Sequence, residues 1–370
     1  MATIEKGTGT IALCAFNRTA ELRKHEFGRP EPGPHDVAID IKYCGMCHSD
    51  LHACKGDWGG DRYPIAPGHE IAGIVTAVGS SVSNSEFKVG DRVGVGCFVE
   101  SCRKCKLCDE GLEQHCDHVV MTYSTPFPDG KGANFEKCVG YHTNGGYSTK
   151  IVVNKHFTYH VPENIKLEHA GPLLCAGITT FSPLNRHILQ KGGGKGKHVG
   201  VVGFGGLGHM AVKIAKAMGA EVTVFSRNNK KEQQAKELGA GLLIHTDEEA
   251  LKAAAHTFDV ILDTVCASHD IASLMGTLTV GGQFVLLGGV PAPFSLSAFP
   301  LLMSRYSVEG SLVGGVPETQ AMLDFCAEHN ISPDCEIIHA KDASEHFKAL
   351  NAGEVGATRA VIDMSTLGEL

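Results

Sequence analysis

The first half of the chain consists of short apolar segments separated by turns. Residues 37–43 and 71–78 alternate apolar and polar positions or run apolar, with glycine and proline between them. Segments of this length and pattern predict β-strands joined by tight turns. We therefore expect a mostly β structure over this part of the chain.

The pattern changes after Lys166, and from Lys197 onward strand-like and helix-like segments alternate. The predicted strands are 198–202, 221–225, 242–245, 258–263 and 283–287, and the predicted helices are 208–218 and 230–238. Such alternation favours a parallel, doubly wound sheet, so the fold class is α/β. A helix over 318–328 and a last strand over 359–363 follow. Two architectures in 370 residues predict two domains.

Composition and charge exclude several classes of protein. The chain is 43% hydrophobic and 20% charged, as globular proteins are. Its net charge of −8, without a basic stripe, argues against a nucleic-acid partner. No apolar run has the length of a membrane span and the N-terminus lacks a signal layout, so we expect a cytoplasmic protein.

In the cytoplasm the 14 cysteines need an explanation other than disulfides. Four of them form the pattern C-x2-C-x2-C-x7-C, namely Cys102, Cys105, Cys108 and Cys116. Four closely spaced thiolates close a tetrahedral shell, so the pattern predicts a structural zinc rather than free thiols or an iron–sulfur cluster. The isolated cysteines are expected to be small buried hydrophobes: Cys14, Cys54, Cys266, Cys326 and Cys335.

Three further segments carry ligands for a second, open zinc site. They are Cys44-Gly-Met-Cys47-His48-Ser49-Asp50-Leu-His52, Gly68-His69-Glu70 and Leu173-Leu-Cys175-Ala-Gly177. Each alone is weak, because a lone histidine beside glycine is commonly a hydrogen-bonded structural residue and a lone cysteine a core residue. Together they are a much more specific signal.

Taken with Gly68-His69-Glu70-x2-Gly73-x5-Gly79-x2-Val82, these segments make nearly the whole chain resemble the zinc-containing medium-chain dehydrogenases. The resemblance is greatest to the cinnamyl alcohol dehydrogenase-like group, which includes broad-range aldehyde reductases. It implies a GroES-like, mostly β catalytic zinc domain over residues 1–175 and 315–370, and a Rossmann nucleotide-binding domain over 176–314. It also implies a homodimer.

The same resemblance assigns roles at the open site. Cys47, His69 and Cys175 would hold a catalytic zinc, and Glu70 would be an alternate ligand, while Cys44 would only pack. The fourth position would admit an alcohol or aldehyde oxygen.

A proton route is implied beside that site. The resemblance places Ser49 on the substrate oxygen and His52 further along a proton relay. We expect Asp50 to orient His69, although helix capping would explain Ser49 and Asp50 equally well as residue types.

A glycine-rich loop follows the predicted strand 198–202 and opens the next helix. It consists of Gly203, Phe204, Gly205, Gly206, Leu207 and Gly208. In that context a G-x-G-x-x-G sequence predicts dinucleotide binding, with the pyrophosphate at the helix N-terminus, rather than a plain glycine-rich turn.

The second strand of this domain indicates which nicotinamide is bound. In an NAD site, this strand ends in an acidic residue. Here Glu221 lies at the start of the strand, and the end of the strand carries Ser226, Arg227, Asn228 and Lys231. These side chains can bind a 2′-phosphate, so we infer NADP(H) over the alternative of a solvated basic loop. The resemblance adds further cofactor contacts: His48, Thr179, Thr264, Gly288, Ser311, Leu312 and Val313.

The substrate pocket departs from that of the plant lignin-pathway enzymes. The resemblance places Trp58, Cys97, Met121 and Leu312 along it, with Met121 at a position where those enzymes have tryptophan and Leu312 where they have phenylalanine. Methionine adapts its shape easily, which favours a broad range of aldehydes. The segment 122–146 is expected to be a surface loop, and Cys138 within it is not expected to bind metal.

The sequence therefore predicts a reductase with two zinc ions per subunit that transfers hydride between NADP(H) and aromatic, allylic or medium-chain aldehydes and their primary alcohols. The alternatives are a polyol dehydrogenase of the same superfamily, or a catalytically silent nucleotide-binding relative.

Overall fold

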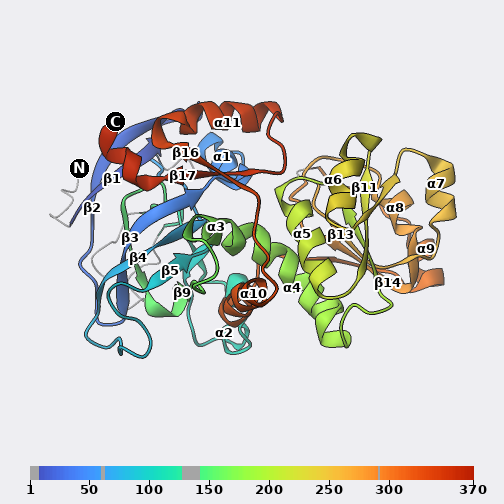
Figure 1. Ribbon diagram of the computed structural model, residues 1–370, viewed down its shortest axis with the longest axis horizontal. Helices are drawn as coiled ribbons and strands as arrows, with labels where there is room; N and C mark the ends of the chain where they lie inside the picture. The colour runs from blue at the N-terminus through green and yellow to red at the C-terminus, as the bar shows by residue number, and fades with distance from the viewer. Residues whose placement is uncertain (1–7, 60–62, 127–141, 291) are drawn as a thin grey trace. The chain divides into compact units, whose positions relative to one another are not determined.

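The computed structural model describes residues 8–59, 63–126, 142–290 and 292–370 (Figure 1). The chain forms two compact units. The first comprises Met1–Cys175 together with Gly315–Leu370, and the second comprises Ala176–Gly314.

The first unit is built on a seven-stranded sheet in the order β16-β17-β3-β4-β5-β9, with β8 also paired to β3. Its strands are β3 (Asp36–Gly45), β4 (Ile71–Val78), β5 (Arg92–Val95), β8 (Lys150–Asn154), β9 (Tyr159–His160), β16 (Cys335–His339) and β17 (Arg359–Asp363). Smaller pairs are formed by β1 (Thr8–Ala15) with β2 (Leu22–Arg29) and by β6 (Phe98–Glu100) with β7 (Val120–Met121). The helices are α1 (His48–Lys55), α2 (Lys106–Asp109), α3 (Leu167–Pro172), α10 (Val316–Glu328) and α11 (Ala343–Ala352).

One strand pairing brings the end of the chain to the first zinc-ligand motif. Strand β17 runs antiparallel to β3, with Val361 opposite Gly45. Strand β3 alternates buried and less buried positions, and the apolar residues Ala360, Val361 and Ile362 of β17 are all buried, so a shifted register would expose apolar side chains. Consequently Arg359, at the start of β17, lies beside the residues that follow β3.

The second unit contains a six-stranded sheet in the order β12-β11-β10-β13-β14-β15, and every pairing in it is parallel. The strands are β10 (His198–Val202), β11 (Glu221–Ser226), β12 (Gly241–Ile244), β13 (Phe258–Asp263), β14 (Leu278–Leu286) and β15 (Ser307–Gly310). Helices lie on both faces (Figure 1): α4 (Ile178–His187), α5 (Gly206–Ala217), α6 (Glu232–Glu237), α7 (Glu248–Ala253), α8 (Ile271–Met275) and α9 (Ala298–Ser304). This arrangement confirms the predicted α/β, doubly wound fold.

The strand order of this sheet reverses between β10 and β13. Strands β11 and β12 lie to one side of β10, and β13, β14 and β15 lie to the other. In open parallel sheets the crevice at the carboxyl ends of two such strands is where nucleotides bind.

The predicted strands over 71–78, 198–202, 258–263 and 359–363 match the observed ones, whereas several other elements differ. Strand β14 begins at Leu278, earlier than the expected start at 283. The prediction missed its first half because that part contains Gly281 and Gly282 and a register irregularity. Strand β15 ends at Gly310, and Val313 just after it has a left-handed φ of 40°. Strand β16 and helix α11 were not predicted.

Two expectations about burial were wrong. Cys266 is exposed, although Cys14, Cys54 and Cys326 are buried and Cys335 is partly buried. The segment 122–146 is not simply a surface loop, because Thr122, Gly145 and Gly146 are buried at its two ends. Residues 127–141, with Cys138, lie outside the described residues.

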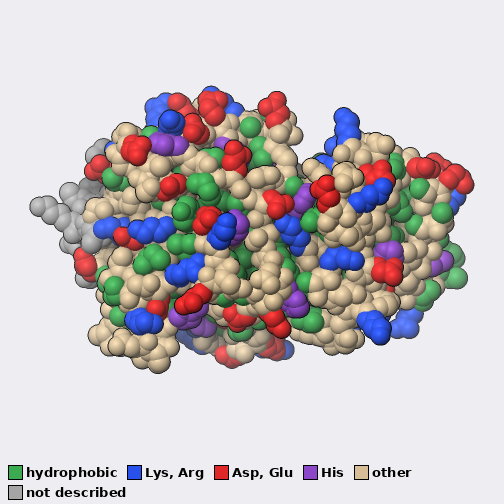
Figure 2. Space-filling model, in the orientation of Figure 1, with side chains coloured by type: hydrophobic (Ala, Val, Ile, Leu, Met, Phe, Trp, Pro, Cys, Tyr) green, Lys and Arg blue, Asp and Glu red, His purple; other side chains and the backbone are tan. Residues whose placement is uncertain are grey.

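The surface mixes charges of both signs. Figure 2 shows acidic and basic side chains interspersed on the face drawn there. Among the described residues, no helix combines the length and the apolar composition needed to cross a membrane.

Candidate metal and nucleotide sites

Cys47, His69, Glu70 and Cys175 form one buried cluster in the first unit, which we call the Cys47 cluster. One ligand atom from each residue lies within 4.8 Å of those of the other three. Cys47 precedes α1 as its N-terminal cap, and His69 and Glu70 precede β4. Cys175 belongs to a single π-helical turn, Leu173–Gly177. Such turns are rare and are frequent at functional sites.

Asp50 orients the His69 ring within this cluster. Asp50 is fully buried in the first turn of α1, and its Oδ1 lies 3.0 Å from His69 Nδ1. In a metal-bound His69 the Nδ1 proton would be donated to Asp50 and the lone pair of Nε2 would face the metal; Nε2 lies 3.2 Å from Cys175 Sγ. Asp50 also accepts a hydrogen bond from the backbone N–H of Cys47, so it caps the helix as well.

The charges of this cluster are strongly coupled. A hydrogen bond from Cys175 lowers the pKa of Cys47, and the positive charge of Arg359 lowers it further. Burial lowers the pKa of His69, but the adjacent Asp50 carboxylate raises it well above its usual value. Burial raises the pKa of Glu70 to about 7.

The donor set fits a zinc ion. Two thiols, an imidazole and a carboxylate are all zinc ligands, and on one tetrahedral zinc a nitrogen and a sulfur would be about 3.5 Å apart. Neither carboxylate oxygen of Glu70 has a hydrogen-bond partner among the described residues, although Glu70 is fully buried. A buried carboxylate of this kind is stabilised by a cation.

Arg359 supplies one positive charge for Glu70 and was not anticipated from the sequence. Its Nη2 forms an ion pair with Glu70 Oε1 at 3.5 Å, and its Nη1 donates to the backbone oxygen of Met46 at 2.8 Å. A single arginine at the start of an apolar strand carries no motif, and only the pairing of β17 with β3 places it here.

The second cluster consists of Cys102, Cys105, Cys108 and Cys116, with α2 among them, and we call it the four-cysteine cluster. Its sulfur atoms lie within 4.8 Å of one another, and three of the pairs are 3.6–3.9 Å apart. Four thiolates around a tetrahedral zinc, with Zn–S bonds of about 2.3 Å, have sulfur–sulfur distances of about 3.8 Å. All four are free thiols. The geometry therefore fits a closed structural site.

The two predicted relay residues lie on α1, one helical turn apart. His52 Nδ1 lies 2.8 Å from a carboxylate oxygen of Asp57, and the His52 ring lies 5.3 Å from the ring of Trp58. Ser49 is partly buried in the first turn. Residues at positions i and i+3 share a helix face, so the hydroxyl and the imidazole belong to the same side of α1.

The glycine-rich loop of the second unit is closely packed at some of its glycines and open at another. A Cβ at Gly208 would lie 2.2 Å from the carbonyl oxygen of Gly203, which itself has a φ of +86°. At Gly205, by contrast, a Cβ would meet nothing within 4 Å. The loop therefore packs tightly against α5 at its ends and is open in the middle, as a pyrophosphate cradle requires.

The loop after β11 lies against this cradle. Lys231 Nζ donates to the backbone oxygen of Phe204 at 2.7 Å, and Ser226 Oγ donates to the backbone oxygen of Asn228 at 2.8 Å. Burial lowers the pKa of Lys231, and the charge of Arg227 lowers it further. The structure thus brings Lys231 to the glycine-rich loop.

The remaining predicted residues occupy the following places. Thr264 donates to the backbone oxygen of Val202 at 2.8 Å, and a Cβ at Gly288 would lie 2.2 Å from the oxygen of Val265, so both line the carboxyl ends of the central strands. Thr179 is buried in α4, while Ser311, Leu312 and Val313 follow β15.

In the first unit, His48, Trp58 and Met121 are exposed, and Cys97 is buried and hydrogen-bonds Cys175. Their cofactor and substrate roles stay predictions.

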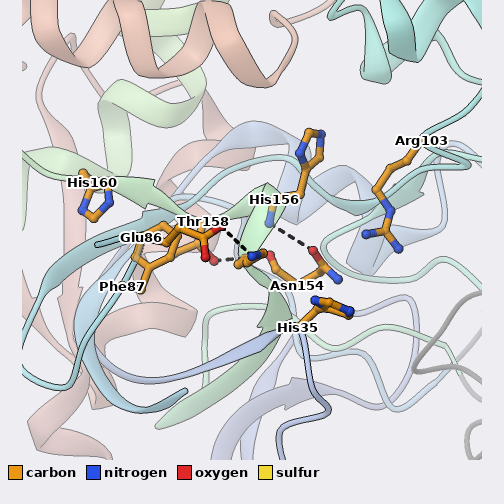
Figure 3. A pocket seen from close by; sticks show the side chains of 9 residues that line it. His35, Glu86, Phe87, Arg103, Asn154, His156, Thr158 and His160 are labelled. Atoms are coloured by element: carbon orange, nitrogen blue, oxygen red, sulfur yellow. Dashed lines mark hydrogen bonds and ion pairs between the residues drawn. The ribbon is translucent and has the colours of Figure 1, made fainter. Parts of the chain in front are cut away.

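One cavity of about 480 Å³ opens on the first unit next to the four-cysteine cluster, since Arg103, between Cys102 and Cys105, lines it (Figure 3). None of the metal-cluster residues lines it. The charges of its cations are compensated: Lys155 pairs with Glu86, Arg103 with Glu100, and His156 with Glu113. The cavity therefore has no strong preference for an anion.

Comparison with known proteins agrees with the fold of each unit. The chain matches the zinc-binding dehydrogenase family over residues 206–328 and the alcohol dehydrogenase GroES-like domain over residues 33–163. It is 48% identical, over 96% of its length and 98% of the relative's, to NADP-dependent alcohol dehydrogenase C 1 of Mycolicibacterium smegmatis. It is 50% identical, over 88% of its length and 87% of the relative's, to a probable mannitol dehydrogenase of Fragaria ananassa.

A solved structure shows the same fold. The cinnamyl alcohol dehydrogenase of Helicobacter pylori, complexed with NADP(H), has 42% identity and a TM-score of 0.85, over 96% of this chain and 98% of that one. The chain belongs to the zinc-binding alcohol dehydrogenase family, in the group that includes the cinnamyl alcohol dehydrogenases and the NADP-dependent alcohol dehydrogenases C.

Proposed function

We propose that this protein is an NADP(H)-dependent alcohol dehydrogenase that works as a reductase of aromatic, allylic and medium-chain aldehydes. The observation that carries the proposal is the Cys47 cluster, in which two thiols, an imidazole oriented by Asp50 and a carboxylate meet within 4.8 Å. The names of the M. smegmatis and H. pylori relatives support the cofactor and the type of reaction.

Each zinc would have its own set of ligands. Cys47, His69 and Cys175 would hold the catalytic ion, with Glu70 able to replace a departing ligand, and the four-cysteine cluster would hold the structural one. When bound, zinc and NADPH supply the polarisation of the aldehyde carbonyl and the hydride.

The proton for the product alcohol comes from the chain itself. Reduction of an aldehyde consumes one hydride and one proton, and the Ser49 hydroxyl is the proposed donor to the substrate oxygen. His52 then returns a proton to Ser49. Its Nδ1 lies 2.8 Å from a carboxylate oxygen of Asp57, and its side chain is partly exposed, so it can exchange protons with solvent.

NADPH preference is proposed to come from the loop after β11. Ser226, Arg227 and Lys231 offer hydrogen bonds and positive charge at the strand end where an NAD enzyme would present a carboxylate. Lys231 already reaches the glycine-rich loop, which supports its assignment to the 2′-phosphate.

The test is NADPH oxidation by zinc-loaded protein with benzaldehyde, cinnamaldehyde and hexanal, with NADH in parallel and Cys47→Ser as the inactive control. Consumption of NADPH with all three aldehydes supports the proposal. If zinc-loaded protein oxidises neither cofactor, the aldehyde-reductase assignment is wrong.

A polyol dehydrogenase is the second candidate, because one close relative is named a probable mannitol dehydrogenase. It is tested by following NADP⁺ and NAD⁺ reduction with mannitol and sorbitol. A kcat/KM for a polyol above that for cinnamyl alcohol would favour it.

We also propose a homodimer formed by the second unit, in a cytoplasmic setting that keeps the cluster thiols reduced. Phe299, Leu302 and Met303 on α9 are exposed apolar side chains, and β15 ends the order of the parallel sheet. Edge strands and apolar patches together favour self-association. Light scattering should give twice the chain mass for the wild type and the chain mass for Leu302→Glu.

A further inference from the structure

Asp50 uses all of its hydrogen-bonding capacity. Its Oδ1 accepts from His69 Nδ1 at 3.0 Å and from the N–H of Gly68 at 3.0 Å. Its Oδ2 accepts from the N–H of Cys47 at 2.9 Å and from the hydroxyl of Tyr147 at 3.2 Å. A carboxylate has about four acceptor positions, so these donors leave Asp50 a single orientation.

Tyr147 differs from the other three donors. Cys47, Gly68 and His69 belong to the ligand motifs or adjoin them, whereas Tyr147 comes from a segment about 80 residues further along the chain than His69. We propose that Tyr147 is a positioning residue for the catalytic zinc: its hydroxyl holds the Asp50 carboxylate in the orientation that directs His69 toward Cys47 and Cys175. This inference rests on the proposed metal site.

The surroundings make Tyr147 rigid enough for this role. Its side chain is fully buried, and its backbone N–H donates to the oxygen of Pro67 at 2.9 Å. A Cβ at Gly68 would lie 2.6 Å from Tyr147 Cδ1, and Gly68 has a φ of +103°. The tyrosine ring therefore packs closely against the turn that precedes His69, which leaves no space for a side chain at Gly68.

Loss of the Tyr147 hydroxyl would leave the Cys47 N–H as the remaining one of these four donors on Oδ2, with the Tyr123 hydroxyl as a further partner of the carboxylate. The Tyr147 hydroxyl donates to a carboxylate, and removal of a direct neighbour of a metal ligand typically costs about 10–100-fold in metal affinity. Tyr147 reaches the ligand His69 only through Asp50, so its removal should have a smaller effect. We expect Tyr147→Phe to accelerate zinc release from the Cys47 cluster about 3–10-fold.

The experiment measures zinc transfer from the full-length, zinc-loaded protein to a chromogenic chelator. The wild type should release zinc in two phases, and Asp50→Asn identifies the phase that belongs to the Cys47 cluster. Tyr147→Phe should accelerate that phase and leave the four-cysteine phase unchanged. Tyr159→Phe is the matched control, because Tyr159 is also a buried tyrosine whose hydroxyl is bonded elsewhere, to Thr319.

A double variant tests whether Tyr147 acts through Asp50. In Asp50→Asn/Tyr147→Phe, zinc release should be no faster than in Asp50→Asn alone, since a shared route makes the effects non-additive. Three results would each overturn the inference. The two substitutions could accelerate zinc release independently, so that their effects multiply in the double variant; Tyr147→Phe could accelerate both phases equally; or Tyr147→Phe and Tyr159→Phe could behave alike. The absorption bands of the cobalt-substituted protein give a second measurement, and they should shift in Tyr147→Phe but not in Tyr159→Phe.

Failure of the metal assignment itself would look different. If Cys47→Ser leaves the zinc content and every zinc-release phase unchanged, the Cys47 cluster is not a metal site, and the inference fails with it. A protein that binds zinc as expected but oxidises no NADPH would instead refute the proposed reaction and leave the role of Tyr147 standing.

Discussion

Lys231 is the side chain on which the preference for NADPH should depend most. It is the partly buried cation of its loop, and its Nζ lies 2.7 Å from the carbonyl oxygen of Phe204 in the glycine-rich loop. Lys231→Met removes the charge and keeps most of the apolar stem, so packing is largely preserved. The expected loss is therefore electrostatic.

The structure sets the size of that loss. A hydrogen bond to a charged group contributes about 1.5–3 kcal/mol. To bind a phosphate, Lys231 must weaken its existing bond to Phe204, which offsets part of the gain. We expect a net loss of about 1–2 kcal/mol, which corresponds to about 5–30-fold in kcat/KM for NADPH.

The assay is the initial rate of cinnamaldehyde reduction with NADPH or NADH as the varied substrate. The kcat/KM for NADH should change less than about twofold, because NADH has no 2′-phosphate to lose a contact. Lys230→Met is the control, since Lys230 is an exposed lysine next to Lys231 in the same loop. An equal loss for NADPH and NADH would mean that Lys231 shapes the glycine-rich loop instead of binding phosphate. An equal loss in Lys230→Met would mean that only the net charge of the loop matters.

Three further predictions concern metal, fold and proton transfer. Cys105→Ser should lower the zinc content from two ions to one per chain and the melting temperature by about 5–10 °C, as elemental analysis and calorimetry would show. Gly208→Ala should lower the melting temperature by a few degrees because its Cβ would lie 2.2 Å from a backbone oxygen, whereas Gly205→Ala should keep the melting temperature and weaken NADPH binding. Unchanged NADPH binding in Gly205→Ala would argue against the pyrophosphate cradle. Asp57→Asn should reduce kcat for aldehyde reduction at most about fivefold, since its ion pair with His52 is partly exposed; a larger loss would give Asp57 a direct part in proton transfer.

The parts of the fold that the sequence predicts are those with a regular apolar pattern. Residues 198–202 and 258–263 form central strands of a parallel sheet and are buried on both faces, so they are continuous apolar runs in the sequence. Strand β16 (Cys335–His339) has no fully buried residue, and its pattern therefore carries little information. The first half of β14 was missed because Gly281 and Gly282 are typical of turns.

The residues of the candidate sites also differ in how far the sequence alone predicts them. Cysteine and histidine are uncommon residues, so their spacing in Cys102–Cys116 and in the segments around Cys47 and His69 is informative from the sequence alone. Arginine and tyrosine occur at many positions without a metal site, and no local pattern marks Arg359 or Tyr147. Both were therefore absent from the predicted site.

The neighbours of a metal ligand are placed by register and by turns, not by motifs. Arg359 reaches Glu70 because β17 pairs with β3 so that Val361 lies opposite Gly45; a shift of one residue would turn its side chain to the other face of the sheet. Tyr147 reaches Asp50 because the N–H groups of Gly146 and Tyr147 bond to the backbone oxygens of Gly68 and Pro67. These contacts join positions far apart in the chain, and each depends on the global fold. A substitution that disturbs either pairing should therefore impair the metal site even when every ligand is intact.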